Sequence, residues 1–239
     1  MPILAYGCSK VGTTSIYDSL LAIGAHTRHL HAISGQKIID TLQSLPSPVK
    51  IITGVREPLG KDLSLFFQGQ ATFEQYIAER GDFHNRLRNI MKDTWKGSQF
   101  LFGYKPSAYG MGFGWFDNEF KKNFGLNIFK TPFDREKGYT IYKKDNIEIF
   151  LYRLENLNNL ESEIGEFINR PDFKLLHTNN AEEKELQFVY KELKKEITFP
   201  RAYVKLYYDD NARMDYFYSK EEKDAFLRKW RIDPQTIYG

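Results

Sequence analysis

The sequence holds a single cysteine, Cys8, among its 239 residues, so the chain cannot form an internal disulfide. Because Cys8 lies beside an apolar run, we expect a small buried hydrophobic side chain and not a nucleophile. No apolar run approaches the roughly 18 residues of a membrane-spanning helix, so we expect no membrane span. The chain begins almost at once with an apolar run. We see no positively charged region followed by an apolar region, which is the pattern of a secretory signal peptide. If it is full length, we expect a cytoplasmic protein.

The sequence also lacks a strong excess of charge of one sign and a cluster of metal-ligating residues. The 34 Lys and Arg residues against 31 Asp and Glu residues give a formal net charge of +3. This mild basic bias suits an anionic nucleotide or an acidic glycan, but it is too small to indicate nucleic acid as a partner. His29 and His31 alternate along an expected strand, and no Cys or carboxylate lies at a helpful spacing. We therefore expect no metal site.

The sequence has no internal repeat, low-complexity tract or Gly/Ser-rich linker. With 41% hydrophobic residues, a chain of this length can bury a sizeable core. These features predict a single domain over residues 1–239. They carry no signal for an oligomeric state.

Strand-like and helix-like patterns alternate within the first 70 residues, which is typical of a parallel sheet with crossover helices. The expected strands cover residues 2–6, 26–31 and 49–55, and the expected helices cover residues 12–23, 35–45 and 61–67. The fold class is therefore α/β, with a central parallel β-sheet flanked by helices. Ligands of such sheets bind at the carboxyl ends of the strands.

The rest of the chain is expected to be mostly helical, with a hairpin over residues 141–154 and a helical C-terminal elaboration. Helices are expected near residues 156–168 and 182–197, with dense Glu and Lys on solvated faces. The Gly- and aromatic-rich stretch 100–115 has two interpretations. Its aromatic faces could stack on sugar rings, but packing in the core is the better default.

The segment from Tyr6 to Ser15 joins the first expected strand to the first expected helix through Gly and hydroxyl residues. A strand that ends in such a turn directs backbone N–H groups, and the positive end of the helix dipole, at one spot where an anion can bind. The pattern predicts a phosphate-binding loop, and ordinary helix capping is the alternative interpretation. The expected ligand-binding residues of this loop are Ser9, Lys10, Gly12, Thr13, Thr14 and Ser15.

The position of the lysine distinguishes this loop from that of nucleotide triphosphatases. Their pattern places Lys directly after the last Gly, whereas here Lys10 precedes Gly12 and Thr13 takes the usual Lys position. A Lys before Gly-Thr-Thr-Ser resembles the 5′-phosphosulfate loop of sulfotransferases, which use 3′-phosphoadenosine 5′-phosphosulfate (PAPS). The resemblance implies a P-loop-like sulfotransferase fold, PAPS as cofactor and no metal.

A second segment supports the same resemblance. The expected strand 49–55 is followed by Arg56-Glu57-Pro58, and Ser64 lies eight residues after Arg56 on the next expected helix. Sulfotransferases have an Arg and a Ser at this spacing, and the two side chains bind the 3′-phosphate of the nucleotide. The planar guanidinium and the compact hydroxyl suit a phosphate monoester. The alternative is a capped helix with an ion-paired Arg.

Later segments resemble a narrower group. Residues 146–157 are similar to the late strand of the sulfotransferase core and are expected to be scaffold. Residues 129–142 and 217–222 resemble bacterial proteins described as capsular polysaccharide synthesis proteins with sulfotransferase-like folds. That resemblance implies a carbohydrate or other hydroxyl acceptor.

Sulfuryl transfer to an alcohol needs a group that neutralises charge on the leaving oxygen and a base for the hydroxyl proton. Lys10 suits the first role, because its ammonium can follow the developing charge. For the base, an imidazole is suitable, and we favour His31, closest to the carboxyl end of its strand, with His29 second. The alternative is that either histidine only forms hydrogen bonds near the sheet edge. Glu57 is the first carboxylate to consider, although a helix-start role suits it better.

Two other functions compete with a PAPS-dependent sulfotransferase. The first is a small-molecule kinase with a phosphate loop, which the misplaced Lys and the missing Asp for Mg²⁺ disfavour. The second is a nucleotide-binding or glycan-binding protein of the same fold without catalysis. Lys10 argues against this second alternative.

Overall fold

The computed structural model describes residues 2–33, 35–70, 113–177, 191, 194–195, 197–209 and 212–238, and residues 65–70 by their backbone. The chain forms two compact units. Unit 1 comprises residues 1–56 and 112–179, and unit 2 comprises residues 57–111 and 180–239. A single domain over residues 1–239 stays a prediction.

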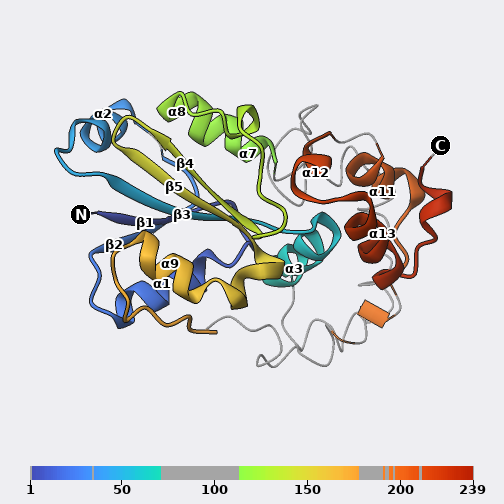
Figure 1. Cartoon of the computed structure of the whole chain (residues 1–239). Helices are drawn as coiled ribbons and strands as arrows, with labels where there is room; N and C mark the ends of the chain where they lie inside the picture. The colour runs from blue at the N-terminus through green and yellow to red at the C-terminus, as the bar shows by residue number, and fades with distance from the viewer. Residues whose placement is uncertain are drawn as a thin grey trace. The chain divides into compact units, whose positions relative to one another are not determined.

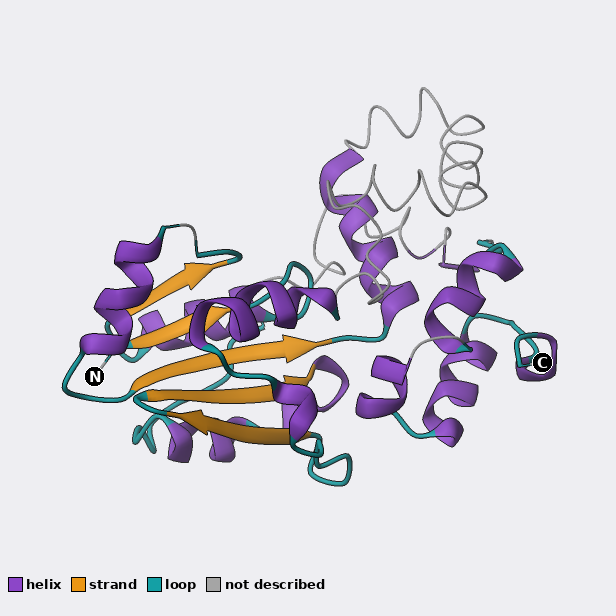
Figure 2. Ribbon diagram, turned by 90° about the horizontal axis from the view of Figure 1, so that it is seen from above, coloured by secondary structure: helices purple, strands orange, loops and turns teal. Residues whose placement is uncertain are grey.

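Unit 1 is built on a five-stranded sheet with the strand order β2-β1-β3-β5-β4 (Figure 1). Strands β2, β1, β3 and β5 run parallel to one another, and β4 pairs antiparallel with β5 at the edge, where its arrow points the other way in Figure 2. The strands are β1 (Ile3–Tyr6), β2 (Thr27–Leu30), β3 (Val49–Val55), β4 (Tyr139–Lys144) and β5 (Ile147–Arg153). The predicted α/β class and the predicted hairpin are confirmed. The sulfotransferase fold itself stays a prediction.

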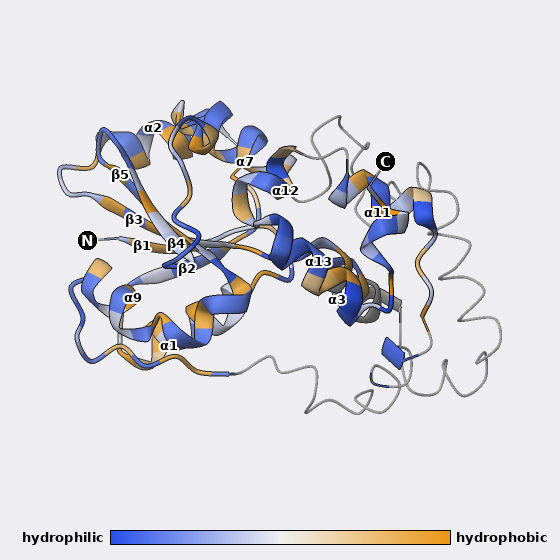
Figure 3. Cartoon of the chain, turned by 45° about the vertical axis from the view of Figure 1, so that its right-hand side comes forward, coloured by the Kyte–Doolittle hydropathy of each residue, from blue (hydrophilic) through white to orange (hydrophobic). Residues whose placement is uncertain are grey.

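Burial explains the composition of the strands. Every residue of β1 and β3 is buried, as expected for central strands of a parallel sheet that are covered on both faces. Hydrophobic residues accordingly recur along β3 and β5 in Figure 3. The edge strand β2 is only partly buried and shorter than predicted. His26 and His31 therefore lie just outside it.

Helices cover both faces of the sheet (Figure 1). One face carries α1 (Thr13–Ala22) and α9 (Glu161–Phe167), and α9 follows a 3-10 helix, η3 (Leu154–Asn159), where a continuous helix was expected. The other face carries α2 (Gln36–Ser44), α7 (Gly114–Phe116), the π-helix η1 (Asp117–Lys121) and α8 (Lys122–Phe124), and the 3-10 helix η2 (Ile128–Lys130) follows in the chain.

Aromatic packing holds the second face. The ring of Tyr6, at the end of β1, lies 4.9 Å from the ring of Trp115 and 5.7 Å from that of Phe120, both edge to face. Phe113 and Trp115 are buried. For this end of the stretch 100–115, core packing is therefore the correct interpretation, and residues 100–112 lie outside the described residues.

The described part of unit 2 is helical. It comprises α3 (Pro58–Gln70), α11 (Arg201–Tyr208), α12 (Ala212–Phe217), α13 (Lys220–Lys229) and the 3-10 helix η5 (Pro234–Thr236). Most of the helix expected at 182–197 lies outside the described residues. Among the helices that are described, none is long and apolar enough to cross a membrane.

A buried carboxylate organises the core of unit 2. Asp62 Oδ2 accepts hydrogen bonds from the hydroxyls of Tyr203 and Tyr207, at 2.5 and 2.6 Å. The ammonium of Lys61 lies 3.6 Å from the other oxygen of Asp62. Burial raises the pKa of Asp62 above its usual range, against the opposing effects of Lys61 and the two hydroxyls. The proton therefore binds more tightly to Asp62 in the folded protein than in the unfolded chain.

Candidate functional site

The loop between β1 and α1 has the backbone of an anion-binding turn. Lys10 and Gly12 both have positive φ angles, of 69° and 91°. A left-handed conformation costs a residue with a side chain roughly 1–2 kcal/mol, so Lys10 is held in an unfavourable state by its surroundings. Gly12 is the N-cap of α1 and provides no side-chain cap, and the first turn of the helix has no acidic residue. The N–H groups of that turn are thus left for an anion.

Two glycines allow the loop to pack closely. A Cβ on Gly7 would lie 2.9 Å from both Thr13 Cγ2 and Thr53 Oγ1. A Cβ on Gly12 would lie 2.8 Å from Leu154 Cδ1. Contacts this short do not occur in folded proteins without displacement of a neighbour, so both positions require glycine.

Tyr152 supports the loop from β5. Its hydroxyl donates a hydrogen bond of 2.9 Å to the carbonyl of Val11, and its side chain is fully buried. Gly54 pairs with Tyr152 across the sheet, and a Cβ there would lie 2.6 Å from the tyrosine ring. Burial raises the pKa of Tyr152 well above its usual range, so the hydroxyl stays a donor. Sequence reasoning treated this strand as scaffold and missed the contact, whose only signal was an aromatic residue near the strand end.

The structure brings Arg56 to the loop. Arg56 follows β3, and its Nη1 donates a hydrogen bond of 3.3 Å to the carbonyl of Lys10. Arg56 is half-buried. The hydrogen bond places its guanidinium at the same end of the sheet as Lys10. Ser64 is buried on α3 in unit 2. A joint role for Arg56 and Ser64 on a 3′-phosphate stays a prediction.

His29 contacts the start of α1. Its Nε2 lies 3.0 Å from the hydroxyl of Thr13, and its ring stacks on Tyr17 at 5.6 Å. Burial and the neighbouring His31 lower the pKa of His29, and Asp18 opposes them. His29 therefore favours its neutral form and holds a hydroxyl of the loop.

His31 lies beyond the end of β2 and is exposed. Its Nδ1 lies 2.7 Å from the carbonyl of Gly7. A carbonyl oxygen can only accept, so Nδ1 carries the proton in the neutral ring and the lone pair is at Nε2. The rings of His29 and His31 are 4.8 Å apart. The two predicted histidines thus lie side by side at the loop, but each has a different partner.

Two residues that sequence reasoning did not select hold the chain around His31. The indole Nε1 of Trp115 donates a hydrogen bond of 2.7 Å to the carbonyl of His31. Oε2 of Glu119 accepts a hydrogen bond of 3.1 Å from the backbone N–H of Ile33. Trp115 ends the aromatic stretch noted in the sequence, but no sequence signal linked it or Glu119 to His31, because more than 80 positions separate them from the segment they hold.

Glu57 has a structural role in unit 2. Its two carboxylate oxygens accept hydrogen bonds from the backbone N–H groups of Leu59 and Gly60, at 2.8 and 2.7 Å, and from the side chains of Tyr208 and Trp230. The predicted helix-start role is confirmed. Because both oxygens are occupied and buried, Glu57 is not suited to be the base.

Two other sequence expectations concern the loop and metal binding. Cys8 is only partly buried, so the prediction that its side chain is buried is wrong. Within the described ranges, no group of three or more His, Cys, Asp or Glu residues could hold a metal ion. The absence of a metal from the reaction stays a prediction.

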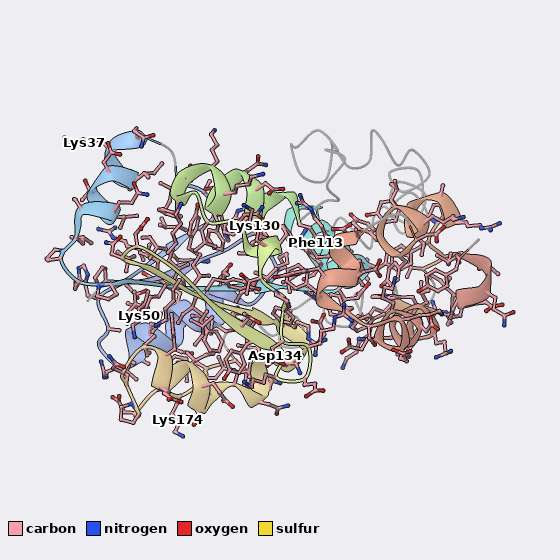
Figure 4. All side chains as sticks on the ribbon, turned by 45° about the horizontal axis from the view of Figure 1, so that its top comes forward. Lys37, Lys50, Phe113, Lys130, Asp134 and Lys174 are labelled. Carbon is pink, nitrogen blue, oxygen red and sulfur yellow. The ribbon has the colours of Figure 1, made fainter. Side chains whose placement is uncertain are left out.

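The basic bias of the chain is distributed over different elements of unit 1. Lys37 on α2, Lys130 on η2 and Lys174 after α9 are exposed, and Lys37 and Lys174 lie at opposite sides of unit 1 in Figure 4. Lys50 on β3 is buried instead, with its ammonium 4.9 Å from the Phe167 ring centre. Burial lowers the pKa of Lys50. These lysines lie on separate elements and not on the loop.

The fold and the site define a mixed α/β protein with a glycine-containing strand–loop–helix turn at its candidate site. Residues 111–219 match the NKWYS family, whose description reads "Putative capsular polysaccharide synthesis protein". The match covers less than half of the chain; it includes Trp115, Glu119 and Tyr152 but not the loop. The predicted resemblance to capsular polysaccharide synthesis proteins is confirmed over this stretch, and the sulfotransferase assignment stays a prediction. No curated protein and no solved structure matches the chain.

Proposed function

We propose that the protein is an enzyme that transfers a sulfuryl group from PAPS to a hydroxyl group of a carbohydrate. The observation that carries the proposal is the uncapped N-terminus of α1, which faces a loop that includes Lys10 and is held by Arg56. The first-turn N–H groups and the hydroxyls of Thr14 and Ser15 suit the 5′-phosphate side of such a nucleotide. The carbohydrate acceptor follows from the description of the family that residues 111–219 resemble.

The fit of a phosphate at the loop rests on two further features. Glycine at position 7 lets the backbone of the loop pack closely against Thr53, whose hydroxyl would lie 2.9 Å from a Cβ at this position. That hydroxyl is buried and has no hydrogen-bond partner among the described residues. A backbone turn with the buried hydroxyl of Thr53 next to it suits an anion better than an apolar ligand.

When bound, PAPS would supply an activated sulfuryl group: a bond would form between its sulfur and the acceptor oxygen, the bond between sulfur and the bridging oxygen of the 5′-phosphate would break, and adenosine 3′,5′-bisphosphate (PAP) would leave. Lys10 would neutralise the negative charge that grows on the bridging oxygen of the 5′-phosphate. His31 takes the proton of the acceptor hydroxyl at Nε2, because its Nδ1 is bonded to Gly7. His29 holds Thr13 and is second in line as the base.

Nucleotide binding can be tested by thermal unfolding in the presence of EDTA. At a concentration 100 times its dissociation constant, PAP should stabilise the protein by about 2.7 kcal/mol. For a chain of this size that corresponds to a rise in Tm of roughly 5–11 °C. AMP lacks the 3′-phosphate and should raise Tm far less. Arg56→Ala should remove most of the difference, whereas the control Arg28→Ala, at an exposed position of β2, should keep it.

The outcome separates the alternatives. Equal stabilisation by PAP and AMP would refute the 3′-phosphate site. Stabilisation by ATP with Mg²⁺, and none by PAP, would favour the small-molecule kinase. PAP binding without turnover on a panel of carbohydrate acceptors would favour a binding protein of the same fold.

Catalysis should depend on Lys10 more than nucleotide binding does. Lys10→Met should lower kcat by on the order of a hundredfold or more, because the ammonium acts mainly in the transition state. The control Lys37→Met removes an exposed lysine of α2 and should leave kcat unchanged. Near-normal turnover of the Lys10→Met enzyme would contradict this mechanism.

A further inference from the structure

The segment 31–33 is fixed by side chains of unit 1 that come from far along the chain. It follows β2, an edge strand, and β2 pairs with β1 only as far as Leu30. Beyond this point the backbone is held through the carbonyl of His31, by Trp115, and through the N–H of Ile33, by Glu119. Trp115 and Glu119 are four residues apart, which places them one turn apart on the same side of a helical segment.

Glu119 also joins this segment to the start of the loop. Its Oε2 accepts hydrogen bonds from the hydroxyl of Tyr6 and, at 3.1 Å, from Asn123 Nδ2. Tyr6 is the last residue of β1 and directly precedes Gly7, whose carbonyl meets Nδ1 of His31. The carboxylate is buried and therefore needs these donors. One side chain thus sets both the end of β1 and the chain that follows His31.

We propose that Trp115 and Glu119 are positioning residues that orient His31. They fix its backbone so that Nδ1 stays bonded to the Gly7 carbonyl and Nε2 is presented to the acceptor hydroxyl. The inference rests on the proposed function for the role of His31 as the base. Both residues lie in the stretch that matches the NKWYS family, whereas the loop lies outside that stretch. The inference therefore gives the matching stretch a part in forming the site.

The indole hydrogen bond can be removed with little change in packing. Trp115→Phe deletes the Nε1 donor and keeps an aromatic ring against Tyr6 and Phe120. The matched control is Trp230→Phe in unit 2, because the indole of Trp230 also donates a hydrogen bond to a buried acceptor, Glu57, at 3.3 Å. A misplacement of about 1 Å at a reacting group can cost on the order of a hundredfold in rate. We expect Trp115→Phe to lower kcat by roughly 10- to 100-fold, with KM and PAP binding nearly unchanged.

A second readout does not depend on activity. Nitrogen-15 NMR of the imidazole rings reports which nitrogen carries the proton in the neutral form. In the wild-type protein, His31 should be protonated at Nδ1. In Trp115→Phe it should become a mixture of tautomers, and the exposed His177 provides an internal reference. Glu119→Ala should act as Trp115→Phe does, whereas Glu119→Gln keeps an acceptor oxygen and should restore the wild-type spectrum.

The two readouts separate failure of the inference from failure of the proposed function. A changed His31 tautomer in Trp115→Phe, in a protein that shows no sulfuryl transfer, would support the positioning role and refute the sulfotransferase. If Trp115→Phe leaves the His31 spectrum and kcat unchanged, as in the control Trp230→Phe, the positioning role would be overturned. Protonation of wild-type His31 at Nε2 would overturn it without any variant.

Discussion

Substitution of Gly12 by alanine tests the packing of the candidate loop. Gly12 is the N-cap of α1 and Gly24 follows the end of the helix, and both have positive φ angles, of 91° and 66°. Their surroundings differ. A Cβ on Gly12 would lie 2.8 Å from Leu154 Cδ1, 3.0 Å from Leu157 Cδ2 and 3.3 Å from the Tyr152 hydroxyl, whereas a Cβ on Gly24 would have no heavy atom within 4 Å. Gly24→Ala is thus a control for the backbone effect alone.

The expected free energies follow from these contacts. In both variants, alanine in a left-handed conformation costs roughly 1–2 kcal/mol, partly offset by about 0.4–1 kcal/mol from the stiffer unfolded chain. Only Gly12→Ala also forces extra volume into a packed region, which costs typically 1–3 kcal/mol. Gly12→Ala should therefore be less stable than Gly24→Ala by about 2 kcal/mol, or roughly 4–8 °C in Tm.

Urea unfolding followed by circular dichroism measures the difference directly, through the midpoint and the slope of each transition. Thermal melting under identical conditions provides the second estimate. If Gly12→Ala and Gly24→Ala agree within about 0.5 kcal/mol, which is near the precision of such comparisons, the close packing of the loop against η3 would be refuted.

Three further predictions address other contacts. Tyr152→Phe leaves the Val11 carbonyl without its hydrogen bond, so it should lower the free energy of unfolding by about 1–3 kcal/mol in urea titrations, and an unchanged midpoint would argue against the contact. Burial raises the pKa of Asp62, so the folded protein holds the proton of this carboxyl more tightly than the unfolded chain does. The contribution of Asp62 to the free energy of unfolding is therefore present at low pH and is lost as the pH rises through the folded-state pKa. Asp62→Asn should therefore gain stability relative to wild type as the pH rises from the acid range toward neutrality, and a gain in the opposite direction would contradict the pKa shift. Glu57→Gln replaces one acceptor oxygen by a donor that faces other donors. Leaving a buried hydrogen-bonding group unpaired costs about 1–3 kcal/mol, so Tm should fall by several degrees. An unchanged Tm would show that these hydrogen bonds do not stabilise α3.

Much of the fold could be predicted because its signals are local. The alternation of apolar runs with helical periodicity predicted β1, β3 and α1 close to their observed bounds, and residues 49–55 form a strand as expected. Strand ends were less predictable. The strand expected over 26–31 is shortened to Thr27–Leu30, because β2 pairs with β1 and ends where β1 ends.

The candidate site, too, could be predicted only in part from the sequence. The glycine and hydroxyl residues of the loop and the position of Arg56 after a strand could be identified from the sequence, because a parallel sheet places the carboxyl ends of neighbouring strands together. The sequence pattern also placed His29 and His31 near that end. The pattern could not tell their partners apart, because a two-residue spacing says which face a side chain is on and not which atom it meets.

The tertiary structure alone decided which groups surround the loop. Tyr152, Trp115 and Glu119 reach it from positions more than 80 residues away, through the pairing of β3 with β5 and the packing of residues 114–121 on the sheet. The tertiary structure likewise bound Glu57 to donors of unit 2 and so removed it as a candidate base. Local pattern determines which segments form helices and strands, since backbone geometry repeats over a few residues. Contacts between distant side chains depend on how those segments pack, and no repeat in the sequence records that packing.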